Sequence, residues 1–208
     1  MKELQSHITT IIDKAEFQFK EKGSLFISQV FHVDSEETAT NILKEIRKLY
    51  FDATHNCYAY KLSNGTSKYS DDGEPNGTAG IRILNAINHE NLFNLLVIVT
   101  RYFGGTKLGV GPLGKAYYDS AIEVLKISKK ISQQLYLHAT IQFDFEFSNL
   151  VHRMISKYSI KIVKTEFSEL TIIECLIPHS DREKFVNELT INSLSKIKIE
   201  VTTLSRYI

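Results

Sequence analysis

LLVIVTRYFGGTKLGVGPLGKAYY, residues 95–118, places an apolar run, a glycine-rich segment and a helical pattern next to one another. The continuous apolar run LLVIV (95–99) is typical of a strand that is buried on both faces. Pro112 suits the first turn of a helix. The predicted buried face of that helix consists of Leu113, Ala116, Tyr117, Ser120, Ala121, Val124 and Leu125. A buried strand is therefore expected to lead through a glycine-rich loop into a helix N-terminus.

The glycine-rich loop permits two interpretations. Exposed backbone N–H groups, the positive end of a helix dipole and the cations Arg101, Lys107 and Lys115 together suit a phosphate or another anion. The loop satisfies neither the GxxxxGK[ST] pattern of a P-loop nor GxGxxG. The alternative is a glycine-rich turn that close helix packing requires. The residues alone leave both interpretations open.

A second unusual stretch, SDDGEPNGTAG (70–80), has three carboxylates in four positions, at Asp71, Asp72 and Glu74. They could hold a hard cation such as Mg²⁺, although the calcium-loop pattern is missing. They could also take part in acid–base chemistry, but a hydrophilic loop gives no reason for a raised pKa. The third interpretation is a tight turn, with aspartates capping N–H groups and Pro75 fixing the bend. Taken alone, the stretch favours the turn.

In the part of the chain that precedes the glycine-rich loop, alternating and helical patterns indicate an α/β arrangement. Strands are predicted at EFQFK and at 25–33, and a helix follows Asp34 with a capping-box-like Glu37. HNCYAYKL (55–62) alternates as a strand that places His55 and Cys57 on one face, about 7 Å apart. That spacing is poor for a nucleophile and its base, so Cys57 is expected to be a small buried side chain. His55 is expected to face a cleft, and Thr78 to cap the next helix.

The second half of the chain predicts a different domain. Nine of the ten glycines lie between Gly65 and Gly114, and none follows Gly114. After a polar junction near 128–134, the patterns predict strand 135–147, helix 149–158, strands 161–167 and 171–177, a helix that begins at a Ser180 to Glu183 capping box, and strand 197–204. This βαββαβ order is that of a ferredoxin-like unit. We therefore expect domains at 1–130 and 131–208.

The composition and net charge of the chain restrict the class of protein. The 208 residues carry 25 Lys and Arg against 24 Asp and Glu, so the net charge of +1 gives no general attraction to nucleic acid or membrane. Two cysteines, Cys57 and Cys175, show no metal-ligand spacing. The first residues lack the apolar region of a secretory signal, and no apolar run approaches about 18 residues. A cytoplasmic protein without metal, cofactor or membrane contact is expected.

Three motifs in this order and spacing, THNCYAY (54–60), SDDGEPNGTAG (70–80) and VTRYFGGTKLG (99–109), resemble the N-terminal domain of the IMPACT family, whose bacterial members are YigZ-like proteins. The second half resembles the small ferredoxin-like domain of those bacterial members. The resemblance implies an α+β protein with a ribosomal protein S5 domain 2-like first domain and a second domain like the last domain of elongation factor G. It also implies a link to translation, because the eukaryotic members compete for an activator of the amino-acid-starvation kinase.

The resemblance implies that the signature polar positions of the family line one cleft. Together with the loop cations, the candidate binding residues are His55, Asp71, Asp72, Glu74, Thr78, Arg101, Gly104, Gly105, Lys107, Gly109 and Lys115. No residue is assigned a catalytic role.

The favoured function is a non-enzymatic binding protein of translation, with RNA, the ribosome or a translation-regulatory protein as its partner. The alternative is a small-molecule enzyme or phospho-ligand binder, in which the cations and loop amides hold an anion while Asp72, Glu74 or His55 moves a proton. A third possibility is a protein-interaction module.

Overall fold

The computed structural model describes residues 5–208, and these form two units. One unit holds residues 8–132, and the other holds residues 5–7 with 133–208. In the described residues no helix is long and apolar enough to cross a membrane. The elements of the first part of the chain are β1 (His7–Ile11), β2 (Ala15–Glu21), β3 (Ser24–His32), α1 (Glu36–Leu49), β4 (His55–Lys61), β5 (Ser67–Ser70), α2 (Gly80–His89), β6 (Leu95–Tyr102) and α3 (Val110–Ile127).

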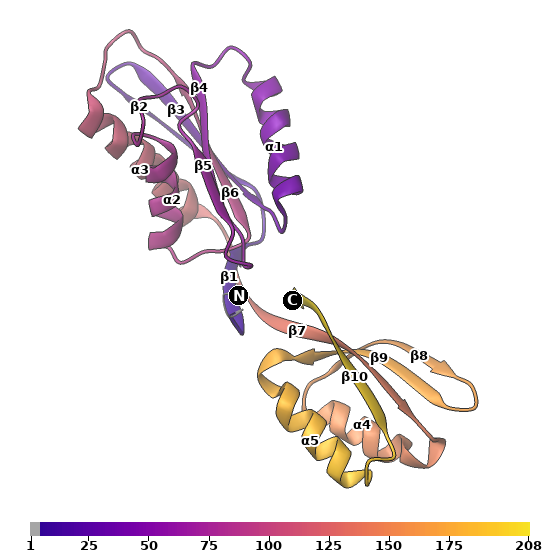
Figure 1. Cartoon of the computed structure of the whole chain (residues 1–208). Helices are drawn as coiled ribbons and strands as arrows, with labels where there is room; N and C mark the ends of the chain where they lie inside the picture. The colour runs from indigo at the N-terminus through magenta and orange to yellow at the C-terminus, as the bar shows by residue number, and fades with distance from the viewer. Residues whose placement is uncertain (1–4) are drawn as a thin grey trace. The chain divides into compact units, whose positions relative to one another are not determined.

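Strand β6 is the centre of the first sheet, whose order is β2-β3-β6-β4-β5. It pairs antiparallel with β3 on one side and β4 on the other. Leu95, Val97 and Val99 pack into a core with α2 and α3, whereas Leu96 and Ile98 pack into a second core with α1. Figure 1 accordingly shows α1 on one face of this sheet and the other two helices on the opposite face. The predicted burial of this strand on both faces is confirmed.

The second unit has the predicted βαββαβ order. Its elements are β7 (Lys130–Phe143), the 3-10 turn η1 (Phe145–Phe147), α4 (Ser148–Lys157), β8 (Lys161–Phe167), β9 (Thr171–Pro178), the 3-10 turn η2 (His179–Asp181), α5 (Arg182–Asn192) and β10 (Lys198–Tyr207). The sheet order is β1-β7-β9-β8, and β10 also pairs with β7. Side chains of α4 and α5 share one core with the sheet, and Figure 1 shows both helices on the same face of that sheet. The α+β class is confirmed, with antiparallel sheets in both units.

The predicted helix caps differ from the observed ones. Helix α1 is capped by Ser35, whose hydroxyl accepts the Thr38 N–H, rather than by Asp34. Helix α5 begins at Arg182 without any side-chain cap, so the capping box predicted at Ser180 is wrong. Thr78 does not cap α2 either, because its hydroxyl donates to the carbonyl of Pro75.

The start of α2 lies against the backbone of β5. A Cβ atom added at Gly80 would lie 2.7 Å from backbone atoms of Ser70, closer than any tolerable contact. Because the obstacle is backbone rather than a movable side chain, only glycine lets the helix approach the strand this closely. This approach fixes the turn at 70–80 between the two elements.

Gly80→Ala is expected to lower the free energy of unfolding by about 2 kcal/mol or more, because α2 must move away from β5. Urea denaturation of the purified protein measures the change. Gly114→Ala in α3 is the matched control: the nearest atoms to its added Cβ belong to the exposed side chain of Arg82. That variant should be unchanged or up to about 1 kcal/mol more stable. Equal stability of the two variants would contradict the packing argument.

Candidate functional site

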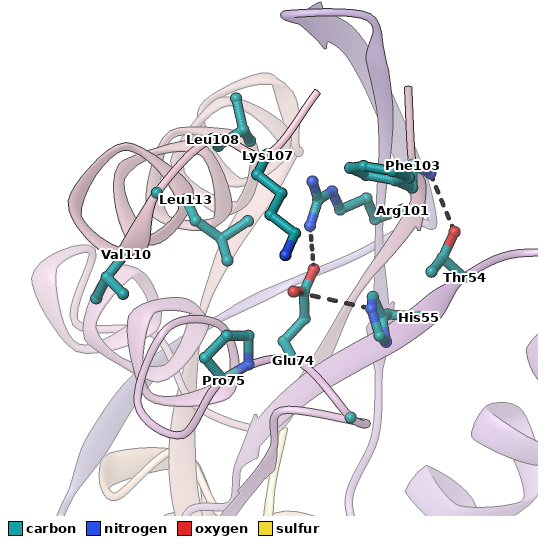
Figure 2. Close-up of a pocket in the computed structure, with 12 residues that line it drawn as sticks. Thr54, His55, Glu74, Pro75, Arg101, Phe103, Lys107, Leu108, Val110 and Leu113 are labelled. Carbon is teal, nitrogen blue, oxygen red and sulfur yellow. Dashed lines mark hydrogen bonds and ion pairs between the residues drawn. The ribbon is translucent and has the colours of Figure 1, made fainter. Parts of the chain in front are cut away.

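A pocket of about 450 Å³ opens between the turn at 70–80 and the glycine-rich loop after β6. Figure 2 shows its charged side chains gathered on one side and aliphatic side chains of the loop and α3 on the other. The lining residues are Thr54, His55, Gly73, Glu74, Pro75, Arg101, Phe103, Lys107, Leu108, Gly109, Val110 and Leu113.

A buried ion pair joins the two motifs at the pocket. Arg101 Nη1 donates to Glu74 Oε1 at 2.6 Å, and the two side chains are only 6% and 4% exposed. Tyr117 donates its hydroxyl hydrogen to the same oxygen at 2.7 Å, and Arg101 Nη2 donates to Ser24 Oγ at 3.2 Å. Such a pair is stable only when further hydrogen bonds offset the desolvation of both charges. Four segments therefore meet in this network.

Strand pairing places His55 next to Arg101, since the two residues are direct partners between β4 and β6. His55 Nδ1 lies 2.8 Å from the carbonyl oxygen of Asp72. A carbonyl only accepts, so Nδ1 carries the hydrogen, and in the neutral ring Nε2 is left as an acceptor. Nε2 lies 3.8 Å from Glu74 Oε2, beyond hydrogen-bond distance. In the neutral form of His55, two acceptors thus lie next to each other, and Figure 2 shows both side chains at the pocket.

The other two carboxylates of the turn accept backbone N–H groups within and next to the turn. Asp71 accepts the N–H groups of Gly77, Ala79 and Gly80 at 2.8 to 3.0 Å, and so satisfies the beginning of α2. Asp72 accepts the N–H of Asn56 at 2.7 Å and also pairs with Arg47. Neither residue lines the pocket, nor does the buried Thr78. The turn interpretation fits both aspartates, and Glu74 is the carboxylate that reaches the pocket.

The glycines of the loop have separate structural roles. A Cβ at Gly104 would lie 1.9 Å from the backbone of Gly23, so this glycine allows the loop to contact the β2–β3 turn. Gly105 and Gly109 have φ values of 85° and 86°, which disfavour other residues. Of the three, only Gly109 lines the pocket, where it precedes α3.

Lys107 and Lys115, two of the cations predicted to bind an anion, lie in different places relative to the pocket. Lys107 lines the pocket and points into it on the side of Glu74 (Figure 2). Lys115 is exposed on α3, pairs with Asp119 and does not line the pocket. The pocket therefore brings together five of the predicted residues: His55, Glu74, Arg101, Lys107 and Gly109.

The apolar lining was not predicted from the sequence as part of the site. Leu108, Val110 and Leu113 follow the glycine loop, and Pro75 belongs to the turn. Phe103, which is adjacent to Gly104 in the sequence, also lines the pocket and offers an aromatic surface there. Its ring is 46% exposed, and the guanidinium carbon of Arg101 lies 5.5 Å from its centroid.

Cys57 is a buried structural residue, as expected. It is fully inaccessible, and its thiol donates to the carbonyl of Asp71 at 3.0 Å. Burial raises the pKa of the Cys57 thiol well above its usual range. Since the thiolate is the reactive form, the burial and the raised pKa of this thiol both disfavour a nucleophilic role.

The Impact N-terminal domain matches residues 22–125, the segment that builds the pocket and its two motifs. The chain belongs to the IMPACT family. IMPACT family member YvyE of Bacillus subtilis is 30% identical over 194 residues, which are 91% of this chain and 89% of that protein. IMPACT family member YigZ of Escherichia coli is 27% identical over 175 residues, covering 81% and 84% of the two chains.

A crystal structure of a hypothetical protein has the same fold as this IMPACT family member. The TM-score is 0.70 at 23% identity, and the match covers 96% of this chain and 98% of the other. At that identity the similarity establishes the two-domain α+β architecture alone.

Arg101→Met is expected to lower the free energy of unfolding by about 3–5 kcal/mol, because it leaves the Glu74 charge buried without its partner. The double variant Arg101→Met/Glu74→Gln should recover a large part of the loss, since the glutamine oxygen can still accept from Tyr117 without a charge. Chemical denaturation of wild type and the three variants in a double-mutant cycle measures the coupling.

Lys48→Met is the control for this cycle. It removes one partner of an exposed pair with Glu45, whose side chains are 74% and 72% exposed, and should change stability by less than about 1 kcal/mol. If Arg101→Met has as little effect as this control, the buried pair does not hold the two motifs together.

Proposed function

We propose that this IMPACT family member is a cytoplasmic, non-enzymatic binding protein that acts on translation through RNA, the ribosome or a translation-regulatory protein. The pocket between the 70–80 turn and the glycine loop is the surface that receives its partner. The second domain is an accessory that faces RNA or the ribosome. The family's link to translation motivates the partner class.

One observation carries the proposal: the two motifs that distinguish the chain meet at a preformed pocket. The ion pair between Glu74 and Arg101 joins the two walls and restrains their positions. A binding site that needs no rearrangement loses less conformational entropy when its partner arrives. A buried charged pair is also an unfavourable choice for stability alone, because apolar residues of similar volume are often as stable or more stable there.

The charge of the pocket favours an acidic group on the partner. Arg101 and Glu74 balance each other, so Lys107 leaves a local excess of positive charge. The N-terminus of α3 adds its positive dipole end, with Gly109 at the cap position and no capping side chain. A phosphate of RNA or a carboxylate of a protein would fit this environment.

A second candidate is a small-molecule enzyme or phospho-ligand binder, and the orientation of His55 favours it. The carbonyl of Asp72 fixes the ring and leaves Nε2 facing the pocket, which is the arrangement that a general base requires. A thermal-shift screen of phosphorylated metabolites, with and without Mg²⁺, tests this candidate. Absence of any stabilisation would contradict it.

Co-sedimentation with ribosomes at low and at moderate salt tests the leading proposal. We expect wild-type protein to pellet with ribosomes at low salt and Lys107→Glu to bind about tenfold more weakly, because it places a negative charge where the acidic group binds. Lys115→Glu makes the same charge change on the same domain outside the pocket lining, and should bind like the wild type.

Two results would contradict the proposal. Failure of the wild type to bind either ribosomes or RNA at low salt removes the translation partner. Equal weakening by both lysine variants would mean that general charge, rather than the pocket, determines binding.

A further inference from the structure

The polar end of the pocket presents two hydrogen-bond acceptors that lack donors. Glu74 Oε1 accepts from both Arg101 and Tyr117, but within residues 5–208 no donor lies within hydrogen-bond distance of Oε2. Neutral His55 offers Nε2 as an acceptor, since its Nδ1 hydrogen is bound to the carbonyl of Asp72. The two acceptors are 3.8 Å apart. One amino group with two hydrogens could bridge them, with a donor–acceptor distance of about 2.9 Å in each hydrogen bond.

A flat apolar body would fit the walls next to this end. Phe103 lies at one side of the pocket, and Leu108 and Leu113 lie at the other (Figure 2). The half-exposed ring of Phe103 offers a face on which an aromatic ligand can stack. The volume of about 450 Å³ lies within the range of about 300–1,000 Å³ that is typical of small-molecule sites.

The pocket also has an anion-binding part. Lys107 points into it, and Val110 at the first position of α3 belongs to its lining. The first N–H groups of a helix have no intrahelical acceptor, and Gly109 supplies no capping side chain. A cation and free N–H groups at a helix start bind phosphate well.

We propose that this pocket binds a nucleotide whose base carries an exocyclic amino group. The amino group bridges Glu74 Oε2 and His55 Nε2, the base stacks on Phe103, and the phosphate binds Lys107 and the start of α3. A base amino group is neutral, so it donates two hydrogens without adding a third cation beside Arg101 and Lys107. An ammonium group, in contrast, would add a third positive charge at this place.

The inference rests on the proposed function in one respect, that this pocket is the partner site. It names the chemical group that the pocket recognises. The nucleotide has two possible sources, a free mononucleotide or an unpaired nucleotide of RNA.

Matched nucleotide pairs test the proposal by isothermal titration calorimetry. Cytidine and uridine monophosphate differ in an amino against an oxo group, as do adenosine and inosine monophosphate. We expect the amino member of each pair to bind about tenfold more tightly, because the oxo group leaves the two acceptors without donors. Oligocytidylate and oligouridylate of equal length form the RNA arm. Preference in the RNA arm together with much tighter binding than the mononucleotide identifies RNA as the source.

Two variants locate the site. Lys107→Ala should weaken binding of cytidine monophosphate about fivefold to tenfold and reduce its salt dependence, because it removes a phosphate contact. Lys115→Ala, which removes a cation of α3 outside the pocket lining, should bind like the wild type. Phe103→Leu should weaken binding of both members of each pair alike, because stacking does not distinguish them.

Three results would overturn the inference: no binding of cytidine or adenosine monophosphate, equal affinity within both pairs, or equal loss in the two lysine variants. Ribosome binding that persists with no amino preference would overturn the nucleotide assignment and leave the translation proposal standing. A preference for the amino nucleotides without ribosome binding would overturn the translation proposal and leave the nucleotide assignment standing.

Discussion

The buried ion pair between Glu74 and Arg101 is the constraint on which the pocket depends. Its two charges come from segments 27 residues apart, and neither would be stable in the interior without the other. The pair also requires Ser24 from β3 and Tyr117 from α3 as hydrogen-bond partners. Sheet, turn and helix are thus held in one arrangement by a polar network rather than by apolar packing alone.

The three neighbouring carboxylates of the turn have different structural roles. Asp71 satisfies the N–H groups at the start of α2, and Asp72 fastens the turn to β4 through the N–H of Asn56. Asp72 also has a positive φ of 43°, an uncommon conformation that its position in the turn maintains. These bonds hold the backbone of the turn, and Glu74 can therefore keep its side chain at the pocket.

The sequence predicted the fold well where periodicity decided it. The apolar run at 95–99 correctly predicted the buried strand β6. The alternating and helical patterns of the second half correctly predicted its βαββαβ order. The helix caps were harder, because a cap depends on which oxygen reaches the N–H groups in space. The cap of α2 comes from Asp71, nine residues before Gly80, and no local pattern at Thr78 could reveal it. The apolar lining escaped prediction for a related reason: it follows from the course of the loop and the turn in space, which bring Pro75 and Leu113 to the same pocket.

The net charge of the chain and the charge of the pocket have different consequences. With 25 basic and 24 acidic residues, the protein as a whole has little long-range attraction for a polyanion. Within the pocket, Arg101 and Glu74 neutralise each other, so Lys107 and the dipole of α3 remain to attract an anion. That charge suits one phosphate or carboxylate, but not a backbone that lies across many contacts. Selectivity must therefore come from the group that fits between Phe103 and Leu113 and satisfies the two acceptors, which is the behaviour of a pocket and not of a basic surface.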